Sequence, residues 1–300
     1  MILNEKQLPL RAWRGLAVSV VALLVWDVLV TVLYLNAVTH FEAIDIQFTL
    51  FGTVIALFVG FMVNAAYGRW WEARTLWGQV VNSSRSLARQ AVVLLDERVP
   101  GAQPGLGAQV VRNQVAYVHV LRTALRGQPL PAEAAAFLGA DRLAHVERAT
   151  NRPTAVLLDS DRLLSEAYRR GMVGELSRLE LEAALVALTD AQGGLERIKN
   201  TPLARQYSQF PRIFVRVFCL LLPLGMVHDL GWFTPLGSAL VGFMFLALDQ
   251  VGIDLEDPFE GRLHDVPMQA ITRAIEVDLH QMIGHLSEPP AVEVERGVLN

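Results

Sequence analysis

Four stretches of the chain are apolar enough to cross a membrane: Gly15–Leu35, Gln47–Asn64, Ile213–Val227 and Trp232–Leu248. The second carries no formal charge. As a helix at roughly 1.5 Å per residue it would be about 27 Å long, close to the ~30 Å hydrocarbon core of a bilayer. The last two stretches are separated only by His228–Gly231, which predicts a tight helical hairpin. We therefore expect two membrane hairpins.

The first stretch is too long to be a typical signal peptide. The apolar region of a signal peptide covers about 7–15 residues and precedes a small-residue cleavage site. Gly15–Leu35 is longer, and no clear small-x-small site follows it. We expect this segment to stay in the mature protein as a transmembrane helix.

Between the two hairpins the pattern changes to that of amphipathic helices. Apolar and small positions recur three or four residues apart, as in Trp77, Val80, Val81, Ser84, Leu87 and Ala91, and again in Leu181, Leu185, Leu188, Leu195 and Ile198. Breaks are indicated at 100–107, 127–131 and Asn151–Pro153. A further amphipathic helix is expected within 268–286. The chain is predicted to be an all-α membrane protein in which a helical domain separates two membrane hairpins.

This organisation divides the sequence into four segments. They are an N-terminal segment with the first hairpin (1–68), a helical domain (69–211), the second hairpin (212–250) and a C-terminal segment (251–300). Hydrophobic residues make up 52% of the chain and charged residues 19%, which argues against a soluble helical protein.

The charges predict how the chain is oriented in the membrane. Arg11 and Arg14 precede the first span and Arg69 follows the second, whereas the loop between these spans carries Glu42 and Asp45 and neither Lys nor Arg. The positive-inside rule therefore places both termini and the helical domain in the cytoplasm. The net charge of −4 is too small and too dispersed to indicate a nucleic-acid partner.

No pattern indicates an enzyme, a cofactor or a metal site. The seven histidines show no zinc-ligand spacing, and no GxSxG, Walker A or GxGxxG motif is convincing. The single cysteine, Cys219, excludes an intramolecular disulfide. Asp27 is an acid deep inside the first span, so we expect it to face protein or water, with Arg216 as a candidate partner. A structural ion pair and a protonatable group both remain open for Asp27.

Three motifs in order resemble the bestrophin family of ion channels, in its bacterial branch. They are YGRWWEARTLWGQVVNSSR (67–85), LERIKNTP (195–202) leading into PRIFVRVFCLLLP (211–223), and DLEDPF (254–259). The resemblance covers nearly the whole chain. It implies a bacterial inner-membrane protein with four transmembrane helices per subunit that assembles as a homopentamer around one central pore. It also implies conduction of monovalent ions, chloride by family precedent.

The resemblance implies two constrictions. Thr53, Leu57 and Phe61 form a stripe at i, i+4 and i+8 of the second span, where the family places a narrow neck. Five copies of Leu57 and Phe61 would make a hydrophobic gate, whereas Thr53 is polar where family members usually have apolar residues. Without the resemblance, these three residues would be ordinary lipid or interhelix contacts. The second constriction, at the cytoplasmic aperture, falls on Leu176, with Val173 or Leu179 as alternatives.

The sign of the permeant ion stays open at this level. Glu42 and Asp45 near the outer mouth, and Glu175 beside the aperture, would concentrate cations if they face the path. Family precedent favours chloride. A Na⁺ or K⁺ channel of the same architecture is the first alternative. A membrane-anchored scaffold or sensor is the second, and permeant ions and membrane lipid are the expected partners besides copies of the chain.

Calcium activation is not expected. Animal members of the family bind calcium through an acidic run that follows Asn-Pro-Phe, and here Arg262, Leu263 and His264 stand at positions that need carboxylates. For the nearby acids Asp254, Glu256 and Asp257, helix capping or pairing with Arg14 or Arg69 is favoured over metal binding because the ligand set is incomplete, and calcium binding near Asp257 stays open.

Overall fold

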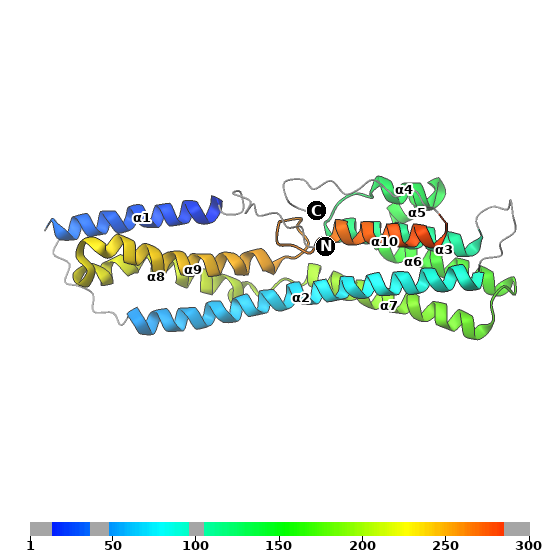
Figure 1. Ribbon diagram of the computed structural model, residues 1–300, viewed down its shortest axis with the longest axis horizontal. Helices are drawn as coiled ribbons and strands as arrows, with labels where there is room; N and C mark the ends of the chain where they lie inside the picture. The colour runs from blue at the N-terminus through cyan, green and yellow to red at the C-terminus, as the bar shows by residue number, and fades with distance from the viewer. Residues whose placement is uncertain (1–13, 37–47, 96–104, 285–300) are drawn as a thin grey trace. The chain divides into compact units, whose positions relative to one another are not determined.

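The computed structural model describes residues 14–36, 48–95 and 105–284. All regular elements in these ranges are helical and none is a strand, so the predicted all-α fold is confirmed for them. The elements are α1 (Arg14–Leu35), α2 (Phe48–Leu95), α3 (Leu106–Leu125), α4 (Ala132–Leu138), α5 (Ala140–Arg148), α6 (Arg152–Arg169), α7 (Glu175–Asn200), α8 (Arg205–Leu230), the short 3-10 helix η1 (Gly231–Phe233), α9 (Thr234–Glu256) and α10 (Met268–Met282) (Figure 1).

The helices cluster into two compact units. One contains α1, α2 up to Trp70, α8 and α9. The other contains α2 from Trp71 onward, α3 to α7, and α10. Three stretches among the described residues are long and apolar enough to cross a membrane: Gly15–Leu35, Phe48–Leu95 and Arg205–Glu256. Because the first unit holds all of α1, α8 and α9, we call it the membrane unit, and the second the helical unit.

The second membrane hairpin turns slightly later than the sequence predicts. His228 and Asp229 remain within α8, and the turn is formed by Gly231–Phe233 instead of His228–Gly231. Gly231 has a φ of +50°, in the left-handed region that glycine adopts without strain. Both polar side chains are largely exposed, so they need no turn to reach solvent and the helix continues through them.

In the membrane unit, α1 packs against α9 around a buried carboxylate. Asp27 is fully buried, and its Oδ1 accepts a hydrogen bond from the Ser238 hydroxyl of α9 at 3.1 Å. Arg216 is exposed on α8, and among the described residues the recorded side-chain partner of Asp27 is Ser238 and not Arg216. The expected pairing of Asp27 with Arg216 is therefore wrong. The reason is a tertiary one, because the Asp27 carboxylate is buried against Ser238 of α9, whereas the Arg216 side chain lies on the exposed surface of α8.

In the helical unit, the predicted helix faces are the buried faces. Trp77, Val80, Ser84, Leu87 and Ala91 of α2 are completely buried, and Val81 is half-buried. The second predicted set, on α7, is buried as well: Leu181, Leu185, Leu188, Leu195 and Ile198. The amphipathic period therefore predicts correctly which side of each helix packs.

Helix α3 is the centre of the helical unit. Every residue from Val115 to Leu121 is buried, and α3 contacts α4, α6, α7 and α10. The predicted break at Asn151 is the start of α6, where the Asn151 side chain accepts a hydrogen bond from the Thr154 backbone N–H at 3.1 Å. An N-cap of this kind satisfies one of the unpaired donors at a helix start.

Candidate functional site

Within the membrane unit, α2 has one packed side and one open side. Ile55, Val59 and Met62 are buried, and the first two belong to the apolar core that includes Leu23 of α1 and Phe218 of α8. Leu57 is two positions from both Ile55 and Val59. At 3.6 residues per turn it therefore points about 160° away from each of them. Leu57 faces directly away from the packing side.

The three residues predicted for the neck lie together on this open side. Leu57 is 57% exposed, Phe61 is 53% exposed, and Thr53 is exposed as well. The Thr53 hydroxyl donates to the backbone carbonyl of Thr49 at 2.8 Å, so its proton is satisfied within the helix while its oxygen remains available as an acceptor. We call Thr53, Leu57 and Phe61 the α2 stripe.

A third side of α2 forms an apolar groove with α8. The cavity measures about 280 Å³ and is lined by aromatic and aliphatic side chains: Phe48, Phe51, Val54, Ile55 and Phe58 of α2, and Phe214, Val217, Phe218 and Leu221 of α8. None of the α2 stripe residues lines this groove. The groove and the stripe are therefore separate surfaces of the same helix.

The sequence reasoning missed Asn64. This residue follows Leu57 by seven positions, so it lies about 20° from Leu57 around the helix. Its side chain is exposed. A polar side chain thus extends the open face beyond Phe61. The signal was the spacing of seven residues between Leu57 and Asn64, which a search at positions i, i+4 and i+8 does not include.

The second predicted constriction is at the start of α7. Leu176 is 80% exposed, the highest fraction among the large apolar side chains of the described residues, and Leu179 is 59% exposed. Val173 is only 8% exposed, so it packs inside the helical unit. Glu175, the first residue of α7, is exposed beside Leu176.

The turn before α7 holds Leu176 in its exposed position. Gly171 has a φ of +70°, and the Met172 backbone N–H bonds to the Ala167 carbonyl, which closes α6. Arg178 then fixes the first turn of α7, because its Nη2 reaches Glu182 at 3.3 Å and its guanidinium lies 5.2 Å from the centre of the Tyr168 ring on α6. Burial, reinforced by a hydrogen bond with Asp161, raises the pKa of Glu182.

At the end of α9, arginines hold the acidic residues. Arg212 contacts the Glu256 carboxylate at 2.5 Å and Asp249 at 3.8 Å, and Arg69 donates to the Glu256 backbone carbonyl at 3.1 Å. The sequence reasoning named Arg69 but not Arg212. Asp254 accepts a hydrogen bond from the Gln250 amide at 2.8 Å. In the part of the chain that the structure describes, no three His, Cys, Asp or Glu side chains form a group that suits a metal ion.

The two acids predicted near the outer mouth, Glu42 and Asp45, lie outside the described residues. The same holds for Arg11 and for the side chain of Arg14. The structure therefore brings together the α2 stripe on one helix face. It exposes Leu176 and Glu175 at the start of α7.

Comparison with known proteins gives concordant matches. The family model described as "Bacterial/Fungal Bestrophin protein" matches residues 10–281. The voltage-dependent anion channel-forming protein YneE of Salmonella typhi is 34% identical over 292 residues, covering 94% of this chain and 94% of that protein. The protein of the same name from Escherichia coli K12 is 32% identical over 305 residues, covering 99% and 98%.

Solved structures agree with the sequence matches. The crystal structure of a bacterial bestrophin homolog from Klebsiella pneumoniae superimposes with a TM-score of 0.81 at 27% sequence identity. The alignment covers 89% of this chain and 98% of that one. The similarity therefore extends over both units and over nearly the full length of the relative.

Proposed function

The chain belongs to the bacterial/fungal bestrophin family, and from this membership we propose that it forms an ion channel that conducts anions, chloride among them. The relatives named above are described as anion channel-forming proteins. The observation that carries the proposal to particular residues is the open face of α2. A stripe that points directly away from the packed core of its own subunit faces either lipid or the axis of an assembly, and the family membership favours the axis.

We propose a homopentamer in which α2 of each subunit lines the path. Rings of Leu57 and Phe61 would then form an apolar constriction that can close by expelling water. Phe61 suits an anion if the positive edge of its ring faces the path, and a cation if the negative face does. The amide N–H groups of Asn64, beyond Phe61 on the same face, can donate hydrogen bonds to a passing chloride.

The start of α7 is the proposed second constriction. Leu176 is the residue we assign to it, since Leu176 is the most exposed of the three candidates and Val173 is buried. We also propose four transmembrane helices per subunit: α1, the first part of α2, α8 and α9, the last two lying within the third apolar stretch, Arg205–Glu256. In the inner membrane, the positive-inside rule places both termini and the helical unit in the cytoplasm.

One observation favours the cation alternative. Glu175 is an exposed carboxylate next to Leu176, and a ring of such carboxylates would attract cations and repel chloride. The identity of the permeant ion therefore depends on whether Glu175 faces the path or turns away from it.

The test is the reversal potential of purified protein in planar bilayers under a KCl gradient. We expect reversal near the chloride equilibrium potential. Reversal near the potassium potential would replace the anion channel by a cation channel. The absence of current from a verified oligomer would favour a membrane-anchored scaffold. Glu175→Gln, compared with the exposed Glu180→Gln on the same helix, reports whether Glu175 faces the path, because only a residue there alters the reversal potential.

A further inference from the structure

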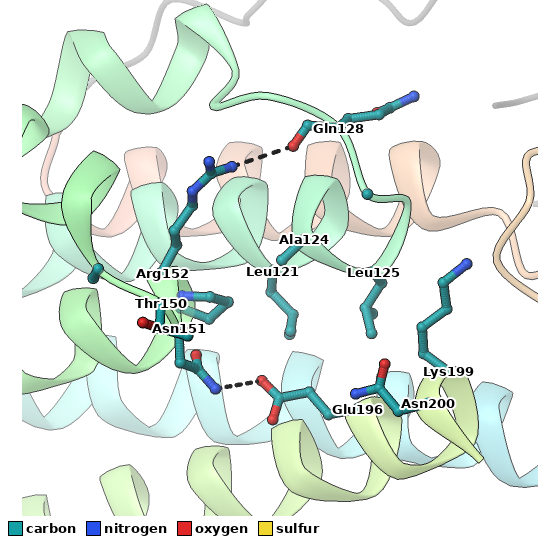
Figure 2. A pocket seen from close by; sticks show the side chains of 13 residues that line it. Leu121, Ala124, Leu125, Gln128, Thr150, Asn151, Arg152, Glu196, Lys199 and Asn200 are labelled. Carbon is teal, nitrogen blue, oxygen red and sulfur yellow. Dashed lines mark hydrogen bonds between the residues drawn. The ribbon is translucent and has the colours of Figure 1, made fainter.

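A cavity of about 530 Å³ opens in the helical unit where three helix ends meet. The C-terminal ends of α3 and α7 and the N-terminal end of α6 surround it (Figure 2). Leu121 and Leu125 extend from α3 toward α7 and give the cavity an apolar wall, to which Pro153 adds. Its volume is in the range typical of small-molecule sites, about 300–1,000 Å³.

The cavity contains one carboxylate that is fixed in place. Glu196 Oε1 receives hydrogen bonds from the Asn151 amide at 2.9 Å and from the Gln192 amide at 2.7 Å (Figure 2). Gln192 is only 3% exposed and Asn151 also caps α6, so both donors are themselves held. No described residue donates to the other oxygen, Oε2, in a recorded hydrogen bond. Glu196 thus presents one oriented, available acceptor.

The cavity also contains one cation whose charge is not neutralised. Arg152 makes a single recorded hydrogen bond within the described chain, from Nη1 to the Gln128 carbonyl, at a long 3.4 Å (Figure 2). A guanidinium has five N–H donors, so most of its capacity remains unused. Lys199 differs, because its ammonium lies 2.6 Å from the Glu260 carboxylate and is paired. The available charges are therefore one positive, on Arg152, and one negative, on Glu196.

The helix ends reinforce this polarity. The N-terminus of α6, beside Arg152, favours negative charge, and the C-terminal ends of α3 and α7 favour positive charge. A purely anionic or a purely cationic ligand would match only one end of the site and oppose the other. A molecule that carries both charges and an apolar portion matches all of it.

We propose that this cavity binds a small zwitterion with an apolar side chain, an apolar α-amino acid being the simplest case. Figure 2 shows the Arg152 guanidinium turned toward Gln128, so it would leave its long hydrogen bond there and turn toward Glu196 when the ligand binds. The ligand carboxylate would then lie on the Arg152 guanidinium and its ammonium on Glu196 Oε2. The side chain would lie against Leu121 and Leu125, and water would fill the remaining volume. The inference does not depend on the proposed channel function, because all the residues involved belong to the helical unit.

The test is isothermal titration calorimetry of L-leucine into the purified full-length protein at neutral pH. 4-Methylpentanoate and 3-methylbutylamine, which keep the apolar part and one charge each, are the comparison ligands. We expect saturable binding of leucine at least about tenfold tighter than that of either comparison ligand, since each lacks one of the two ion contacts. No saturable heat with leucine, or equal binding of 4-methylpentanoate, overturns the proposal.

Substitutions in the cavity test whether leucine binds there. We expect Arg152→Gln and Glu196→Gln each to weaken leucine binding about tenfold. Arg169→Gln, exposed on the same helix as Arg152, and Glu180→Gln, exposed on the same helix as Glu196, should bind as the unaltered protein does. Unchanged affinity in both cavity variants overturns the assignment. The three-ligand comparison requires no variant, so a variant that fails to fold leaves the test intact.

Discussion

His119 and Glu276 form a buried pair that joins α3 to α10. His119 Nε2 lies 3.0 Å from Glu276 Oε2, which also accepts from Arg273 Nη1 at 2.7 Å. Both members of the pair are almost fully buried. Burial by itself would raise the pKa of Glu276, but the hydrogen bond with His119 and the positive charges of His119, Arg273 and His280 outweigh it. The pKa of Glu276 is therefore held below its ordinary value of 4.5.

This depressed pKa predicts a pH-dependent contribution to stability. A carboxylate whose pKa is lower in the folded than in the unfolded state stabilises the fold above its unfolded pKa and loses that contribution as pH falls through the folded pKa. The thermal stability of the helical unit should therefore fall below about pH 4.5. Glu276→Gln should lower the free energy of unfolding at neutral pH by about 1–3 kcal/mol and so lower the melting temperature. The melting temperature of this variant should also fall less steeply in acid.

Melting temperatures measured from pH 7 into this acid range check the prediction. The exposed Glu147→Gln is the control and should follow the unaltered protein. Parallel acid profiles for Glu276→Gln and the unaltered protein would contradict the role given to the buried pair.

At the scale of elements, α2 and α3 approach each other closely at Gly107. A Cβ added to Gly107, in the first turn of α3, would lie 2.6 Å from the backbone carbonyl oxygen of Ala91 on α2. A backbone atom cannot rotate away as a side chain can, so Gly107→Ala must separate the two helices. We expect a loss of about 1–3 kcal/mol, as for other overpacked sites.

Gly78→Ala is the matched control. Gly78 lies in the interior of α2, and a Cβ there meets nothing within 4 Å. This substitution should stabilise the helix by roughly 0.5–1 kcal/mol, because alanine loses less backbone freedom on folding. Denaturant unfolding followed by circular dichroism measures both variants. Equal stability of the two would refute the close-packing account of Gly107.

The sequence predicts the buried face of a helix well, because buried positions recur at a regular spacing. It predicts poorly any contact that depends on which two helices pack together. The spacing of Trp77, Val80 and Leu87 is enough to identify the buried side of α2. Nothing in the sequence indicates that Asp27 faces Ser238, because that contact depends on which helix packs against α1. The end of α8 is misplaced for a different reason, since His228 and Asp229 are polar enough to suggest a turn yet exposed enough to stay helical.

At the scale of the whole molecule, the α2 stripe acquires a role only in an assembly. The i, i+4, i+8 spacing predicts that Thr53, Leu57 and Phe61 share a face, and they do share an exposed one. Spacing alone does not distinguish a face toward lipid from a face toward a path, since both are apolar in a membrane helix. The family resemblance supplies that distinction, and the proposal that the stripe faces the path rests on it.

Cysteine accessibility tests this central claim most directly. The single native thiol, Cys219, is buried and is first replaced by alanine, after which Leu57→Cys and Val54→Cys are introduced separately. Both positions are exposed and apolar, but Val54 lines the groove toward α8. During recording in planar bilayers, a charged, membrane-impermeant thiosulfonate should reduce the current of Leu57→Cys channels and leave Val54→Cys channels unchanged. Modification that alters only the Val54→Cys current would contradict the proposal that the α2 stripe lines the path.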